Sequence, residues 1–322
     1  MTVRDAAGPA IGELRALQVA IELCYFDVLP LRPRIRWLES YTGYLTRVAQ
    51  ANTISSVDGL SALVFAHQDR RVTRTAADFP PLSFGDLPML AARPVPVLLR
   101  TTFYHLATKF GRSAHPQPLS RFLAGSIYAS LRYCPDCLRD TGYYSLTWRF
   151  LALPGCVRHG RRLLDICGHC GWPVPLFAAP LRIGICPRCG GDVRTCIAEQ
   201  LDADKKAVTL SRFYDLVFLL SPRLEIGDDG DSARYVGWRL GYRRRVGGLL
   251  ARDVAVRLGT SLNQVWGIER GSVVNKGASF ATYVAYADLL GLTIRDVFTA
   301  PLLPHDMDDV ATTEEAADDG EA

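Results

Sequence analysis

Residues 134–137 read Cys134-Pro135-Asp136-Cys137, and three more pairs of metal-binding residues follow at the same spacing. These pairs are Cys156/His159, Cys167/Cys170 and Cys186/Cys189. A Cys-x-x-Cys turn points two sulfur atoms at one point, and two such turns supply the four corners of a tetrahedral zinc site. Taken in order, the pairs predict a site of three cysteines and one histidine, followed by a site of four cysteines.

The loops between the paired residues support this grouping. The chain from Cys137 to Cys156 and the chain from Cys170 to Cys186 have the lengths of zinc-ribbon loops. Because both ligand sets are complete, whereas a catalytic zinc keeps one position for water, we expect two structural zinc ions and no catalytic metal. Residues that favour turns lie in or beside the pairs: Pro135, Gly168, Gly171, Pro187, Gly190 and Gly191.

Four other residues bear on this interpretation. A disulfide framework is the alternative use of the sulfurs, but His159 completes a set that disulfides do not need. His169 lies between two ligands of the second site, where it either stays solvated beside them or competes for metal. Cys24 and Cys196 fall outside the pairs, and their roles stay open.

The composition indicates a basic protein with more than one module. With 322 residues, 48% of them apolar, the chain is long enough for two or three compact modules. The apolar segment 14–29 is interrupted by charged residues and has the spacing of a core helix, so we expect no membrane span. Cysteines held as zinc thiolates suit a reducing compartment, and we expect a cytoplasmic protein.

The net charge of +4 hides an uneven distribution. From Asp306 onward the chain is rich in Asp and Glu and has no Lys or Arg, so the rest of the chain is strongly basic. A basic body suits nucleic acid or another anionic partner. The tail is expected to be disordered, and competition between the tail and DNA for the basic surface stays open.

Apolar spacing predicts helices on both sides of the zinc region. They are expected over 37–52, with Asn52 as a cap, over 123–131 and over 206–220. The proline-rich stretch 79–96 predicts short helices or loops.

The segment 251–270 predicts a helix-turn-helix. Two stretches of helical spacing, 251–258 and 262–270, flank the turn Gly259-Thr260-Ser261. Further helices expected over 238–246, 280–290 and 293–298 complete a five-helix bundle. Basic residues far outnumber acidic ones in this region, and an ordinary bundle with a solvated basic face is the alternative to a DNA-binding domain.

The sequence therefore predicts a mainly α fold with small zinc-ribbon elements. The expected divisions are an N-terminal extension (1–34), a helical domain (35–131), a tandem zinc-binding region (132–200), a helix and linker (201–232), a helix-turn-helix domain (233–303) and an acidic tail (304–322).

Residues 259–271 resemble the recognition helix of phage-repressor-type (Xre/Cro-like) DNA-binding domains. The resemblance implies base-edge contacts from Ser261, Leu262, Asn263, Gln264 and Gly267. Leu262 and Gly267 occupy positions at which the more sequence-specific domains of this type have polar side chains. Their presence implies limited sequence specificity. Basic residues expected to contact DNA are Arg243, Arg244, Arg245, Arg270 and Lys276.

A second resemblance covers residues 35–195. The pattern is similar to the TniQ/TnsD family of transposon target-selection proteins. It comprises Glu39-Ser40, Tyr44-Leu45, Arg47-Val48-Ala49, Asn52, residues 132–137, Trp148-Arg149, residues 156–159 and the four-cysteine set. The resemblance implies a non-catalytic bacterial adaptor that recognises a target and recruits the AAA+ ATPase TnsC, which brings in the transposase.

The expected function is thus target selection on double-stranded DNA in the nucleoid, without enzymatic activity, since the chain has no P-loop or Gly-x-Ser-x-Gly motif. A zinc-containing transcriptional repressor of a mobile element and a protein-binding scaffold are the alternatives. The transposase, an RNA-guided complex and a second copy of the chain stay open as further partners.

Overall fold

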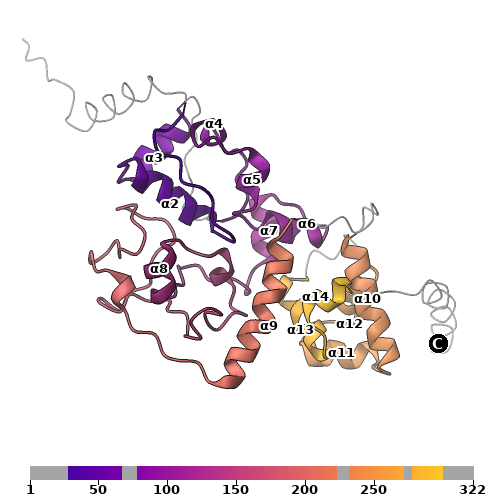
Figure 1. Ribbon diagram of the computed structural model, residues 1–322. Helices are drawn as coiled ribbons and strands as arrows, with labels where there is room; N and C mark the ends of the chain where they lie inside the picture. The colour runs from indigo at the N-terminus through magenta and orange to yellow at the C-terminus, as the bar shows by residue number, and fades with distance from the viewer. Residues whose placement is uncertain (1–27, 67–77, 223–231, 272–277, 300–322) are drawn as a thin grey trace, which may run out of the picture. The chain divides into compact units, whose positions relative to one another are not determined.

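The computed structural model describes residues 28–66, 78–222, 232–271 and 278–299 (Figure 1). These residues form helices joined by loops, and within them extended pairing is limited to isolated β-bridges. The mainly α fold with small zinc modules is confirmed. None of the described helices is long and apolar enough to cross a membrane.

The chain divides into two compact units, each continuous in space but not in sequence. Unit 1 comprises Met1–Ala107, Ser113–Ser120 and Ser126–Pro222, and unit 2 comprises Thr108–Arg112, Arg121–Gly125 and Arg223–Ala322. The candidate metal ligands all belong to unit 1, and the candidate base-reading residues all belong to unit 2.

Helix α2 (Tyr41–Ala51) forms the centre of the unit 1 core. Ser40 caps its start, because the Ser40 hydroxyl accepts a hydrogen bond from the Gly43 N–H at 3.1 Å. The helix therefore begins at Tyr41, and the expected start at Trp37 was wrong. The expected cap at Asn52 is confirmed, since Asn52 ends the helix.

Helices α3 (Val57–Val64), α4 (Leu87–Leu90) and α5 (Val95–Leu99) contribute with α2 to one continuous apolar core. Helices α6 (Tyr104–Lys109) and α7 (Pro116–Phe122) follow in the chain. The helix expected over 123–131 is absent. Helix α7 lies just before it and ends at Phe122, and Gly125 takes a left-handed conformation (φ 71°) that stops further helix.

The rest of unit 1 holds the two cysteine-rich modules. Its elements are α8 (Pro135–Thr141), the 3-10 helices η1 (Leu146–Arg149) and η2 (Val193–Thr195), and α9 (Ala203–Leu220). Helix α9 begins three residues earlier than the expected residue 206, because the Asp202 carboxylate accepts the Lys205 N–H and caps it.

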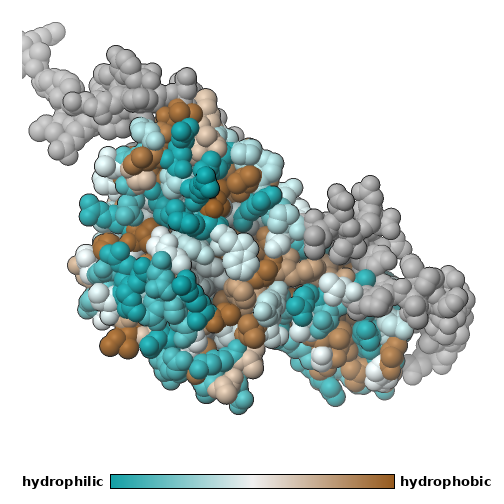
Figure 2. Space-filling view, in the orientation of Figure 1, coloured by the Kyte–Doolittle hydropathy of each residue, from teal (hydrophilic) through white to brown (hydrophobic). Residues whose placement is uncertain are grey.

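Unit 2 contains five helices, as the sequence predicts, but the first begins at Ser232, six residues before the expected start at Trp238. They are α10 (Ser232–Val246), α11 (Ala251–Leu258), α12 (Leu262–Glu269), α13 (Phe280–Leu289) and α14 (Ile294–Thr299). Helix α10 packs closely on α12 because it has glycine at the contact. A Cβ on Gly237 would lie only 1.7 Å from the Ile268 carbonyl oxygen. Figure 2 shows hydrophobic surface over the part of this unit that carries α11, where Val256 is 81% exposed.

Unit 2 also takes aromatic residues from much earlier in the chain. The ring of Phe110 lies 5.3 Å from that of Phe122, 5.2 Å from Tyr283 and 5.7 Å from Phe280. Phe110 is 1% exposed, so these edge-to-face contacts form part of the core of the unit. The helices after residue 232 thus complete their core with residues 108–112 and 121–125.

Candidate metal centres and DNA-contact surface

The first candidate metal centre gathers Cys134, Cys137, Cys156 and His159. Cys134 precedes helix α8, and Cys137 lies in its first turn. Nδ1 of His159 lies 3.5, 3.2 and 3.6 Å from the sulfurs of Cys134, Cys137 and Cys156. The imidazole nitrogen therefore faces the three sulfurs together, as a fourth ligand does.

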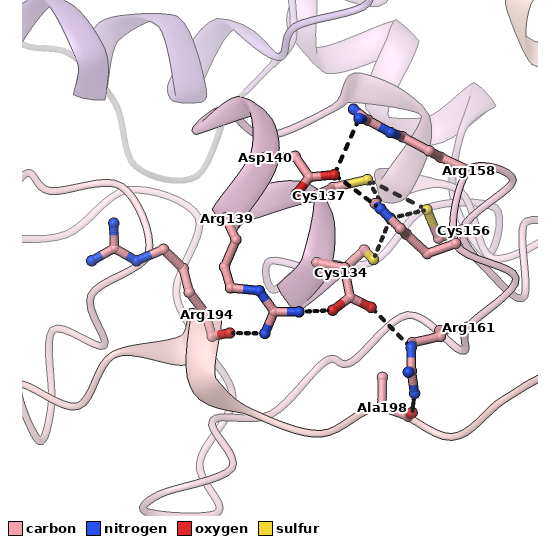
Figure 3. A network of polar contacts seen from close by, with 11 residues as sticks. Cys134, Cys137, Arg139, Asp140, Cys156, Arg158, Arg161, Arg194 and Ala198 are labelled. Atoms are coloured by element: carbon pink, nitrogen blue, oxygen red, sulfur yellow. Dashed lines mark hydrogen bonds and ion pairs between the residues drawn. The ribbon is translucent and has the colours of Figure 1, made fainter.

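The other nitrogen of His159 is held by a carboxylate. Nε2 lies 3.1 Å from Oδ2 of Asp140, which also pairs with Arg158 at 3.1 Å (Figure 3). A carboxylate behind a metal-binding histidine fixes the ring orientation and leaves the facing nitrogen free to bind metal. Asp140 lies one turn after Cys137 on α8, so the same helix supplies ligands and their support.

The second candidate metal centre gathers Cys167, Cys170, Cys186 and Cys189. The sulfur–sulfur distances are 3.8 Å from Cys167 to Cys189 and 3.9 Å from Cys170 to Cys186. Tetrahedral zinc with Zn–S bonds of about 2.3 Å separates its sulfurs by about 3.8 Å. These two distances match that spacing, and all four sulfurs lie within 4.8 Å of one another.

Three of the four pairs lie in the same type of turn. In each, the residue after the second ligand is a left-handed glycine whose N–H bonds back to the first ligand's carbonyl, at 2.8 to 2.9 Å. These glycines are Gly160, Gly171 and Gly190. Gly160 is the one that the sequence analysis missed, although its place directly after His159 matches the other two.

Contacts among the thiols of the first site shift two of their pKa values in opposite directions. Hydrogen bonds with Cys134 and Cys137 lower the pKa of the Cys156 thiol to about 3, whereas hydrogen bonds with Cys134 and Cys156 raise the pKa of Cys137. A bound cation would displace thiol protons, as thiolate ligation requires.

Cys196 and His169 lie outside both ligand sets. Nε2 of His169 lies 2.9 Å from the Asp192 carbonyl and 3.2 Å from the Thr195 hydroxyl. The sulfur of Cys196 lies beside Gly168, where a Cβ would approach it to 2.7 Å. Cys24 falls outside the described residues.

A salt-bridge network joins α8 to the segment after the second site. Asp136 pairs with Arg139 and, at 2.9 Å, with Arg161, and Arg139 donates to the Arg194 carbonyl of η2 at 3.0 Å (Figure 3). Asp136 stands between Cys134 and Cys137. The two candidate metal centres are therefore linked through side chains rather than through the backbone alone.

Several polar residues of the N-terminal pattern have structural roles. Asp78, which the sequence analysis missed, accepts both the N–H and the hydroxyl of Thr42 at 2.8 Å and forms a buried ion pair with Arg149. Arg132 donates to the carbonyls of Phe150 and Leu153. These contacts hold the helical region and the first metal module together in unit 1.

In unit 2, the start of α12 is accessible. Ser261 and Asn263 are exposed, and Gln264 and Leu262 are half-buried. The Ser261 hydroxyl caps the helix by accepting the Gln264 N–H at 3.2 Å, and the Gln264 side chain accepts from Thr260. Gly259 ends α11 in the left-handed conformation, at φ 63°. This turn leaves the amide of Asn263 directed to solvent at the first turn of a helix.

The basic residues expected to contact DNA separate into two groups. Arg243 and Arg270 are exposed, and Arg245 is 27% exposed and 4.0 Å from Glu269. Arg244 is only 7% exposed, and its guanidinium binds Glu269 in the core. The expected DNA contact by Arg244 was therefore wrong. Lys276 lies outside the described residues.

A comparison with known protein families finds a match for part of this sequence. Residues 30–163 match the model of the TniQ family. The match includes all four ligands of the first candidate metal centre and ends before Cys167. No curated protein matches the chain. The family resemblance seen in the sequence is confirmed, whereas the Cro-like resemblance of residues 259–271 stays a prediction.

Proposed function

We propose, from the match of residues 30–163 to the TniQ family, that the chain is the target-selection adaptor of a transposition system. Proteins of this family are non-catalytic adaptors that act with DNA in transposition. The finer proposal is that unit 2 reads the target, while the TniQ region recruits a TnsC-like AAA+ ATPase that brings in the transposase.

The observation that carries the DNA-reading step is the accessible start of α12. Its exposed Asn263 carries an amide that suits bidentate contact with adenine, and Gln264 beside it has the same chemistry. Exposed Arg243 and Arg270 supply charge for phosphates. A helix that presents amides flanked by arginines is equipped to bind the major groove.

We propose zinc as the ion of both metal centres. Three thiolates with an imidazole, and four thiolates, are the ligand sets of structural zinc, and both sets are complete. The ions would hold unit 1 in shape and leave chemistry to other proteins of the system.

Recruitment is tested with the full chain and a TnsC-like AAA+ ATPase. A double variant, Asn263→Ala with Gln264→Ala, should still retain the ATPase in a pull-down while losing preference for its target DNA. If the unaltered chain binds no such ATPase and instead represses a promoter of the mobile element, the repressor alternative is the better account.

A further inference from the structure

Three arginines stand at alternate positions just before the first helix of the TniQ region. Arg32, Arg34 and Arg36 are exposed, whereas Pro33 is half-buried and Ile35 packs against the core of unit 1. This alternation is that of an extended chain with one face on the core and the other in solvent. We call these three residues the arginine strip.

The backbone that carries the strip is anchored at each arginine. The Arg32 carbonyl accepts a hydrogen bond from Arg93 at 3.5 Å, and the Arg34 carbonyl accepts one from Arg47 at 3.1 Å. The Arg36 N–H donates to Glu39 at 2.8 Å. The strip is thus held in place before it meets any partner, which lowers the entropy lost on binding.

The start of the strip is clamped as well. The Asn52 side chain accepts the Leu31 N–H at 3.1 Å and donates to the Leu31 carbonyl at 2.7 Å. Asn52 is the residue that ends α2, so the helix fixes the register of the strip. Each exposed guanidinium therefore has a defined place along the chain.

The carboxylate beside the strip forms its salt bridge with a different arginine. Glu39 is 0% exposed and is neutralised by Arg47 at 2.8 Å. Among the residues that the structure describes, the ion pair of this region joins Glu39 to Arg47 and leaves out all three arginines of the strip. Arg93, which donates to the Arg32 carbonyl, adds a further positive charge beside the strip.

We propose that the arginine strip binds the phosphate backbone of double-stranded DNA, as a second contact separate from α12 and independent of sequence. Guanidinium groups suit phosphate because their N–H donors form paired, charge-assisted hydrogen bonds. The residues between the strip's arginines, Pro33 and Ile35, have no hydrogen-bonding side chain that could read a base edge. The strip therefore holds DNA without selecting it.

The regular spacing of the strip favours DNA over an acidic protein segment. Alternate residues of an extended chain lie about 6.6 Å apart. Phosphates recur along each DNA strand every 3.4 Å or so of helix axis, at fixed intervals. Three anchored arginines can follow such a repeating anion, whereas carboxylates on a flexible acidic peptide would gain little from a fixed spacing.

The test measures how salt affects binding of the full chain to a random-sequence duplex. The variant carries Arg32→Gln, Arg34→Gln and Arg36→Gln. Each lost phosphate contact reduces the slope of log K against log salt by about 0.9, so a reduction of roughly 2 to 3 is expected. A control with the same loss of charge at exposed sites elsewhere in unit 1 should keep the original slope: Arg162→Gln, Arg182→Gln and Lys205→Gln.

Two outcomes would overturn the proposal. One is an equal loss of slope in the control, which would assign the effect to net charge. The other is an unchanged slope in the strip variant, and if that variant also loses the ATPase in a pull-down, the strip is a protein contact. Because random DNA is used, the result is independent of whether α12 reads sequence.

Discussion

Arg244 on α10 and Glu269 on α12 form a two-pronged ion pair in the core of unit 2. Nε of Arg244 donates to Oε1 of Glu269 at 2.7 Å, and a terminal guanidinium nitrogen donates to Oε2 at 2.9 Å. The Tyr286 hydroxyl of α13 donates to Oε1 at 2.5 Å, and Arg244 also donates to the Leu249 carbonyl at 2.8 Å. The pair thus joins three helices and the loop before α11.

Burial would lower the pKa of Arg244, but the hydrogen bonds and charge of Glu269 raise it instead. Removing one partner leaves the other charged and buried. We therefore expect Arg244→Ala to destabilise unit 2 by about 3 to 5 kcal/mol. Thermal unfolding monitored by circular dichroism measures this loss.

The neighbouring arginine provides the control for this prediction. Arg243 is exposed, so Arg243→Ala should change stability by about 0.5 kcal/mol or less and should weaken binding to all DNA sequences alike. Comparable stability losses in the two variants would mean that the Arg244–Glu269 pair contributes nothing specific to the fold.

The metal centres give a prediction of stoichiometry. Elemental analysis of the purified chain should find two zinc ions, and Cys134→Ser or Cys186→Ser should each remove one. Each site is expected to contribute roughly 10 kcal/mol or more of folding energy, so both variants should lose structure in unit 1. Cys196→Ser is the matched control, because Cys196 lies outside both ligand sets. Retention of two zinc ions by the Cys134 variant would contradict the assigned ligands.

The contact between Asp140 and His159 predicts a graded effect on the first site. Asp140→Asn keeps the size of the side chain but removes the charge that holds Nε2 of His159. We expect zinc affinity of that site to fall by about 10- to 100-fold, with the second site unchanged. Competition with a chromophoric chelator separates the two sites. The same substitution at exposed Asp204 on α9 should leave both affinities as they were.

The two clusters of candidate metal ligands were predictable because local spacing alone defines them. A pair of ligands two residues apart lies in one turn, and this rule needs no knowledge of distant contacts. The limits of α11, α12 and α13 were predictable to within a residue for the same reason. Gly259 ends α11, and Ser261 and Ser279 cap the starts of α12 and α13, so each acts on a helix directly beside it in the sequence.

The roles of Arg244 and Phe110 depended on distant partners. A run of three arginines gives no sign that the middle one pairs with Glu269, since α10 turns that one side chain inward. Phe110 packs against Tyr283, far along the chain, and no local pattern connects them. Such contacts follow from tertiary packing, which overrides the local preference for an exposed arginine.

Phe110 therefore yields a prediction about the extent of unit 2. Phe110→Ala removes a fully buried ring that contacts Phe122, Phe280 and Tyr283, and should destabilise unit 2 by about 3 to 5 kcal/mol. Hydrogen exchange read at α13 would report this loss. Unchanged protection there would show that the helices after residue 232 fold without the earlier segments.

The last prediction concerns sequence reading by α12. Asn263→Ala and Gln264→Ala each remove a potential two-bond contact with adenine, so each should weaken binding to the selected target by about 1 to 3 kcal/mol and random DNA much less. Asn263 is exposed, whereas the Gln264 side chain already accepts a hydrogen bond from Thr260. The larger loss is therefore expected for Asn263→Ala. Thr260→Val frees Gln264 from that contact and should leave the effect of Asn263→Ala intact. The measurement is competition binding with target and random duplexes at one salt concentration. Equal losses on both duplexes would mean that α12 holds DNA without reading it.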